Sequence, residues 1–175
     1  MAGPEPGLRP GRLMADQDPR VLQQQAQDFR AGFQSVLIAT TSPEGEPDIS
    51  YAPFVLDDSG RVCIYISQLA RHTRNLAAQP QASLMFIAAE QESRNLFARQ
   101  RLILQCTAHQ VPEAETEPVL QQMQSQFGKT LELLRSLPDF HLFRFEVETG
   151  SYIKGFGQAW SLEGNDLQIL ALRTN

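Results

Sequence analysis

The strongest constraint on the fold is a series of three short apolar segments separated by two compact turn signals. Residues 35–41 are β-branched and aliphatic, and residues 49–56 and 61–67 are similarly apolar. The intervening stretches, Ser-Pro-Glu-Gly-Glu-Pro-Asp and Asp-Asp-Ser-Gly, combine proline, glycine and acidic residues as tight turns do. Apolar side chains occur at both odd and even positions of the third segment, which suits a strand in a closed or covered sheet.

The rest of the chain adds further strands and a few helices. A helix is predicted to begin at Asp18-Pro19, where Asp18 can cap the first turn, and to stop at Gly32. Further helical patterns cover residues 71–79, 119–127 and 131–137, and residues 90–100 are polar and helix-permissive. Strands are predicted at residues 82–88, 101–111, 140–147, 151–156 and 158–162.

These elements favour a mainly β fold. Strands and helices do not alternate strictly, so a doubly wound parallel sheet is disfavoured. A small antiparallel β-barrel with peripheral helices fits best, because closing the sheet removes its exposed edges. The 175 residues suffice for one domain. Residues 1–17, rich in proline and glycine, are predicted to form a flexible N-terminal tail, and residues 18–175 a single domain.

Composition narrows the classes of partner. The formal net charge of -5 argues against bulk nucleic-acid binding, so an anionic ligand needs a local cluster of positive charge. The longest aliphatic stretch, residues 36–39, is too short to span a membrane, and no signal peptide is visible. We therefore expect a cytoplasmic protein. Cys63 and Cys106 lie in strand-like runs and are expected to be reduced, buried thiols.

Several familiar motifs are absent or incomplete. Gly155-Phe156-Gly157 resembles the start of a dinucleotide fingerprint, but Trp160 occupies the third glycine position and no helix pattern follows. The sequence has neither a phosphate loop nor a nucleophile elbow. Its three histidines are widely spaced, and neither cysteine lies at a metal-ligand spacing from them. A structural zinc site is therefore not expected.

One segment carries a cluster of groups suited to binding an anion. The strand predicted to end at Ser67 is followed within a few residues by a helix, and such a junction presents free backbone amides. Arg71 and Arg74 share one helical face, while Ser67, His72 and Thr73 offer further donors. The cluster suits a phosphate or a carboxylate. Arg101, at the start of a long strand, is a candidate to reach the same site. The alternative is that both arginines merely solvate a surface helix.

Five separate stretches, in order, carry a resemblance to a known family. They are Ser-Tyr-Ala-Pro-Phe-Val at 50–55, Ala-Arg-His-Thr-Arg-Asn-Leu at 70–76, and Leu-Phe-Ala-Arg-Gln-Arg-Leu at 96–102, followed by Asp-Phe-His-Leu-Phe-Arg-Phe at 139–145 and Lys-Gly-Phe-Gly-Gln-Ala at 154–159. Across residues 33–167 the chain resembles the pyridoxamine 5'-phosphate oxidase-like, FMN-binding split-barrel superfamily. Within it, the sequence is most similar to bacterial haem-utilisation proteins of the HugZ/HutZ type.

The resemblance implies a six-stranded antiparallel split barrel that forms a homodimer with cofactor sites between the subunits. In flavin-binding relatives, the strand-to-helix junction binds the FMN phosphate, a role that maps here onto Ser67, Arg71, Thr73, Arg74 and Asn75. In haem-utilising relatives, the haem propionates need cations of the same kind, for which His72 and Arg99 or Arg101 are candidates. Lys154 and Gln158 are secondary candidates at the interface; for Lys154 the alternative is a solvated strand charge.

Two features depart from the resembled families. The haem-utilising relatives supply an axial histidine from a C-terminal segment, whereas in this sequence no histidine follows His141. Asp139 matches a family aspartate thought to hydrogen-bond that ligand; alternatively, it is a turn residue after Pro138. Nothing matches the pyridoxal-phosphate pocket of the true oxidases.

The resemblance leaves the cofactor, haem or FMN, open, along with the class of function. One hypothesis is a cofactor-dependent oxidoreductase, which degrades haem or uses FMN. The other is a non-catalytic haem storage or trafficking protein.

Overall fold

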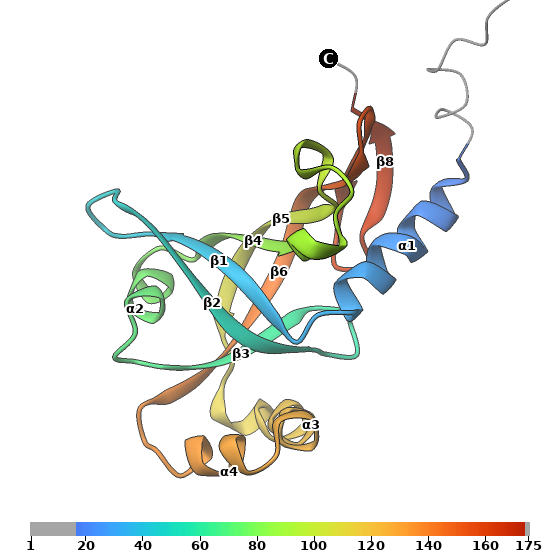
Figure 1. Ribbon diagram of the computed structural model, residues 1–175. Coiled ribbons are helices and arrows are strands. Elements are labelled where there is room, and N and C mark those ends of the chain that lie inside the picture. Colours follow the sequence, from blue (N-terminus) through green and yellow to red (C-terminus); the bar gives the residue numbers. More distant parts are fainter. Residues whose placement is uncertain (1–16, 174–175) are drawn as a thin grey trace, which may run out of the picture.

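The computed structural model describes residues 17–173 as a mainly β protein (Figure 1). Eight strands form one antiparallel sheet in the order β3-β2-β1-β4-β5-β6-β7-β8, and β3 also pairs with β6. The first six strands therefore close into a barrel, as predicted. The strands are β1 (Ser35–Thr41), β2 (Pro47–Leu56), β3 (Val62–Ser67), β4 (Gln81–Ile87), β5 (Arg101–Gln110), β6 (Phe140–Gly155), β7 (Gln158–Glu163) and β8 (Gln168–Leu172).

Strand β6 closes the barrel and extends beyond it. Its first half pairs with β3, from Val62↔Phe145 to Ser67↔Phe140, and its second half carries β7. The sequence predicted two strands interrupted near Gly150, which was wrong. Gly150 instead lies within the strand because β5 approaches very closely there: a Cβ at this position would lie 2.5 Å from the carbonyl oxygen of Ile103. The short strand β8 was not predicted.

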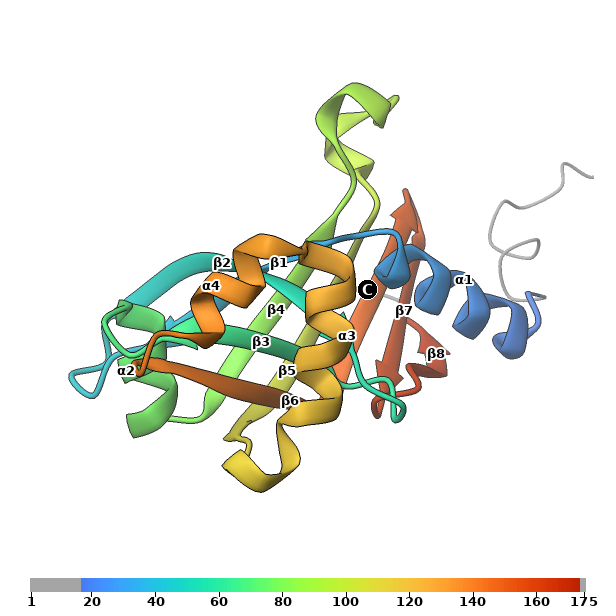
Figure 2. The ribbon, with the colours of Figure 1, turned by 90° about the horizontal axis from the view of Figure 1, so that it is seen from below.

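Four helices surround the barrel. They are α1 (Pro19–Ala31), α2 (Arg71–Ala78), α3 (Glu117–Phe127) and α4 (Lys129–Arg135). Helix α1 begins as predicted, with the Asp18 carboxylate accepting a hydrogen bond from the amide of Arg20 at 2.9 Å. Helices α3 and α4 lie together over β3 and β6 (Figure 2). The helix-permissive segment 90–100 forms only two short 3-10 helices, Glu90–Glu92 and Leu96–Ala98.

The apolar residues form two cores. The larger fills the barrel and includes Leu84, Leu104 and Phe145, all fully buried. The smaller lies between α3, α4 and the barrel wall, and includes Cys63 and Met123. Both cysteines are free and buried, and burial raises the pKa of Cys63 to about 11 and that of Cys106 to about 12. They therefore remain protonated thiols that pack as small apolar groups, as predicted.

The described residues also limit what the fold can host. No helix between residues 17 and 173 is long and apolar enough to cross a bilayer. Within the same range, no group of three or more histidine, cysteine, aspartate or glutamate side chains could hold a metal ion. The tail predicted over residues 1–17 lies, apart from Gln17, outside the described part of the chain.

Candidate functional site

Ser67 organises the junction between β3 and α2. Its carbonyl oxygen accepts hydrogen bonds from the amide of Ala70 at 3.1 Å and from the Thr73 hydroxyl at 2.6 Å. Its own hydroxyl accepts from the amide of Leu69 at 3.1 Å and donates to a carboxylate oxygen of Asp139 at 2.5 Å. The hydroxyl donors of Ser67 and Thr73, which the sequence assigned to a ligand, therefore shape the turn itself in this structure.

Asn75 joins α2 to the barrel. The side chain is buried and donates to the hydroxyl of Thr40 on β1 at 2.9 Å. Thr73 is equally buried, and its hydroxyl donates to Ser67 instead. Both residues fix the position of α2, so the groups still able to meet a ligand are the first-turn amides and the side chains of Arg71, His72 and Arg74.

The first turn of α2 presents free positive groups. Among residues 17–173, no acceptor pairs with the backbone amides of Arg71, His72 and Thr73. The Arg71 guanidinium lies 2.9 Å from Glu46 and 3.8 Å from Asp48, both on the β1–β2 hairpin, and is half exposed. Such exposed ion pairs contribute at most about 1 kcal/mol, so Arg71 can exchange a carboxylate of the hairpin for one of a ligand.

Arg74 and His72 complete this turn. Arg74 donates to the carbonyl oxygen of Leu69 at 2.8 Å and is otherwise exposed. His72 is half-buried, and its Nε2 atom is buried with no hydrogen-bond partner among the described residues. Burial lowers the pKa of His72, while Asp48 nearby acts in the opposite direction. The imidazole is therefore neutral at pH 7 and keeps an unsatisfied ring nitrogen.

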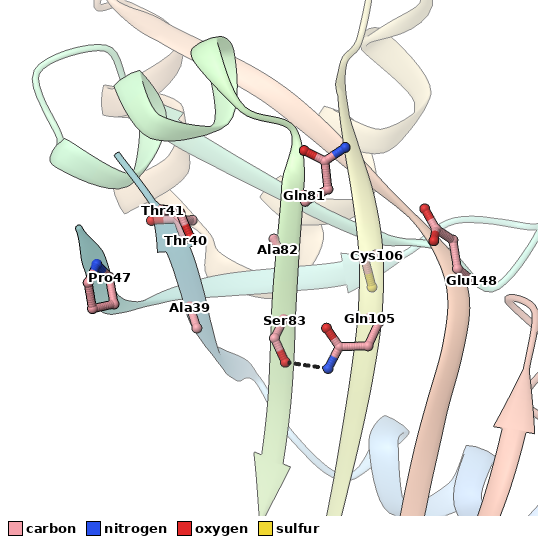
Figure 3. Close-up of a pocket in the computed structure, with 10 residues that line it drawn as sticks. All are labelled: Ala39, Thr40, Thr41, Pro47, Gln81, Ala82, Ser83, Gln105, Cys106 and Glu148. Carbon is pink, nitrogen blue, oxygen red and sulfur yellow. Dashed lines mark hydrogen bonds between the residues drawn. The ribbon is translucent and has the colours of Figure 1, made fainter. Parts of the chain in front are cut away.

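A shallow pocket of about 370 Å³ adjoins this junction on the barrel wall (Figure 3). Thr40, which accepts from Asn75, and Pro47, which lies between the two acidic partners of Arg71, both contribute to it. Across the pocket, Gln105 donates to the Ser83 hydroxyl at 3.2 Å. Sequence reasoning missed this pocket, although the polar residues alternating along β4 and β5 were a signal. Its lining is Ala39, Thr40, Thr41, Pro47, Gln81, Ala82, Ser83, Gln105, Cys106 and Glu148.

Arg101, Lys154 and Gln158 lie at the other end of the barrel. Helix α2 leads into β4 at Gln81, which pairs with Thr107, whereas Arg101 pairs with Ile87 at the far end of the same two strands. The expectation that Arg101 reaches the α2 junction was therefore wrong within one copy of the chain. The cause is the direction of β4, which runs away from α2 to the end of the sheet where its antiparallel partner β5 begins; Figure 1 shows the two strands side by side.

The cations at this far end are committed to their own chain. Arg101 donates to the carbonyl oxygen of Arg99 at 2.9 Å. Lys154 donates to the Gln25 side chain at 2.6 Å, with its ammonium 5.9 Å from the centre of the Trp160 ring. Gln158 pairs with Gly155 across the β6–β7 turn.

A second hollow of about 300 Å³ lies at the far end beneath the segment 88–100, where Arg99 forms an ion pair with Glu90 at 3.2 Å. Its lining includes Arg94, Lys154 and Phe156. The site residues proposed from the sequence thus form two groups at opposite ends of the barrel.

The α2 end fits the acidic part of a planar cofactor. Free amides at a helix N-terminus and two arginines form a donor set for phosphate or carboxylate. Apolar surface for a flat ring system lies beside it, since Leu69 is 78% exposed and Ile49 and Tyr51 on β2 are 70% and 68% exposed. These residues therefore fit either haem or FMN.

Comparison with known proteins places the chain in a family. Residues 22–154 match the family described as pyridoxamine 5'-phosphate oxidase. The chain is 42% identical over 149 residues to heme oxygenase HutZ of Vibrio cholerae serotype O1. The matched region covers 83% of this chain and 84% of that protein.

Solved structures of similar fold support the same family assignment. The crystal structure of HutZ, described as the heme storage protein from Vibrio cholerae, matches with a TM-score of 0.67 and 40% identity, covering 73% of this chain and 90% of that one. Campylobacter jejuni ChuZ matches with a TM-score of 0.80 and 29% identity, covering 92% of this chain and 67% of that one. The resemblance found in the sequence is confirmed: the chain belongs to the pyridoxamine 5'-phosphate oxidase family.

Proposed function

We propose that this chain binds haem between two copies of itself and serves in haem utilisation. The observation that carries the proposal is the 42% identity to heme oxygenase HutZ over most of both chains. The α2 junction supports it independently, because it presents unpaired amides and exchangeable arginines in a protein whose net charge is -5. An anionic ligand would gain little from the overall field of such a protein and needs this local cluster.

The residues at the junction would hold the carboxylates of the ligand. Arg71 and Arg74 supply charge-assisted hydrogen bonds, and the amides of residues 71–73 supply neutral ones. Asn75 and Thr73 keep the helix in place through their bonds to Thr40 and Ser67. Haem supplies the redox chemistry of its iron when bound, while the protein orients it and controls access of water.

An apolar row on the outer surface supports the proposed homodimer. Tyr51, Leu37, Met85 and Ile103 are register neighbours across β2, β1, β4 and β5, and none of the four is fully buried. If two copies pack antiparallel through this row, the α2 end of one meets the far end of the other. Arg101, Lys154 and Gln158 of the partner subunit would then join the site, although they lie far from α2 within one copy.

Two points of the proposal have alternatives, namely the role in haem utilisation and the identity of the cofactor. The Vibrio cholerae relative is described both as a heme oxygenase and as a heme storage protein, so catalysis and storage are both represented among the relatives. FMN is the alternative cofactor, because free amides at a helix N-terminus bind phosphate well. The proposal also includes two expectations from the sequence, namely a single domain over residues 18–175 and a cytoplasmic location.

Spectroscopic titration tests the proposal. Haemin added to the purified protein at micromolar concentration should produce a saturable shift of the Soret band, with one haem per chain. FMN added in parallel should keep its free fluorescence; stoichiometric quenching would favour the flavin alternative instead.

Adding a reductant under air to the haem complex then distinguishes a haem-degrading enzyme from a non-catalytic haem carrier. Loss of the Soret band with release of iron indicates an enzyme, and an unchanged band indicates a carrier. Absence of binding by either ligand contradicts the proposal.

A further inference from the structure

We infer that Asp139 is a positioning residue for the anion-binding turn, acting through the Ser67 hydroxyl. The inference rests on the proposed function, because it concerns how the α2 junction is prepared for the acidic groups of its ligand. The observation behind it is the 2.5 Å hydrogen bond from Ser67 to the Asp139 carboxylate, which joins the end of β3 to the segment that leads into β6.

Asp139 contacts the turn at two points. Its carboxylate accepts from the Ser67 hydroxyl, and its backbone carbonyl oxygen accepts from the amide of Gln68 at 2.6 Å. Directly beside these contacts, Ser67 and Phe140 form the last residue pair of β3 with β6. The turn thus leaves the barrel at its closing seam, and these two hydrogen bonds join it to the residue that precedes β6.

The carboxylate also decides how the Ser67 hydroxyl is used. A serine hydroxyl can rotate and act as donor or acceptor, whereas an ionised carboxylate only accepts. Asp139 therefore accepts the hydrogen bond that the Ser67 hydroxyl donates, and the lone pairs of the Ser67 oxygen remain directed to the amide of Leu69, 3.1 Å away. This arrangement fixes the residues that precede the free amides of α2.

The charge of Asp139 works against an anionic ligand nearby. A carboxylate next to a site for phosphate or propionate lowers the local positive potential, so electrostatics alone would not favour an aspartate here. Its position is explained if its acceptor geometry matters more than its charge. An asparagine keeps an acceptor oxygen and removes the charge, so the two contributions can be separated experimentally.

The test compares Asp139→Ala, Asp139→Asn, Ser67→Ala and the double variant Ser67→Ala/Asp139→Ala by titration with haemin. Both single alanine variants should bind about tenfold more weakly, and the double variant no more weakly than either, since the two residues act through one bond. Asp139→Asn should bind at least as tightly as the unaltered protein. Asp58→Ala, which removes an exposed turn carboxylate, is the matched control and should leave the affinity unchanged.

A second measurement separates this inference from the proposed function. Amide hydrogen exchange of residues 68–70, whose amides are hydrogen-bonded in this turn, should become faster without ligand in Asp139→Ala and stay slow in Asp139→Asn. If the unaltered protein binds no haemin, the proposed function fails, and the exchange rates alone decide whether Asp139 orders the turn. If haemin binds and Asp139→Ala binds it equally well with unchanged exchange, the inference is overturned. Weaker binding by Asp139→Asn than by Asp139→Ala would also contradict it.

Discussion

At the α2 end of the barrel, Arg71 pairs with the exposed Glu46 and the partly buried Asp48 of a hairpin and lies beside unpaired backbone amides. At the opposite end, Lys154 is bonded to Gln25 and lies over Trp160, and Arg101 is bonded to its own loop. Both ends carry cations, yet their surroundings differ. We therefore expect the anionic ligand at the α2 end, where Arg71 and the first-turn amides are free to exchange partners.

The largest effect is expected when the cations of each end are removed separately, which tests whether the α2 end contributes more to haemin binding than the opposite end. Arg71→Ala/Arg74→Ala should weaken haemin binding about tenfold or more, a loss of about 1.4 kcal/mol or more, because charge-assisted hydrogen bonds are lost where donors are free. Arg101→Ala/Lys154→Ala should weaken it roughly threefold, because Lys154 is already bonded to Gln25 and Arg101 lies at the end of β5 away from α2. Affinities are measured by Soret titration.

The matched control for this pair of variants is Arg20→Ala/Lys129→Ala, which removes two exposed cations from α1 and α4. It should bind haemin as the unaltered protein does, and thermal unfolding should show that every variant folds. Equal losses at both ends would mean that the ligand uses both ends equally. A larger loss at the Arg101 end would reverse the ranking of the two ends.

A smaller effect should come from the hairpin carboxylate that competes for Arg71. Glu46→Gln removes the closer partner of Arg71, 2.9 Å away, without removing any donor. Haemin binding should become roughly two- to threefold tighter, since an exposed ion pair contributes at most about 1 kcal/mol. The gain should shrink in high salt, where exposed charges are screened. Unchanged affinity at low salt would show that Arg71 does not meet the ligand.

The smallest expected effect concerns pH and stability at the α2 end. Burial lowers the pKa of His72 below its ordinary 6.5, so the unfolded chain takes up the proton first as the pH falls. The contribution of the neutral imidazole to stability is therefore complete above pH 6.5 and is lost as the pH falls through the lower folded-state pKa. The urea midpoint should drop less between pH 7.5 and pH 5 in His72→Gln than in the unaltered protein. An equal drop in both would contradict this role.

Much of the fold followed from local signals. Short apolar runs bounded by glycine, proline and acidic residues placed β1 and the β2–β3 turn well, and Asp18-Pro19 marked the start of α1. The long strand β6 was not foreseen, because Gly150 normally signals a break. The close approach of Ile103, Leu104 and Leu162 on the neighbouring strands explains a glycine there, and these contacts are not encoded locally.

The candidate site was predictable in position but not in detail. The helix start after Ser67 and the spacing of Arg71 and Arg74 indicated an anion site from the sequence alone. The use of Ser67 to bind Asp139 was hidden, because the two residues meet only through barrel closure. The separation of Arg101 from α2 was hidden for a similar reason, since it depends on strand direction in the β4–β5 hairpin.

The pairing of β3 with β6 has a consequence for the order in which the protein can fold. Strand β3 ends at Ser67, but its partner Phe140–Phe145 is synthesised only after β4, β5, α3 and α4. A nascent chain on the ribosome therefore holds one edge of β3 unpaired while residues 68–139 are synthesised, with its apolar residues available to other chains. This edge is covered only when residues 140–145 pair with it and the barrel closes.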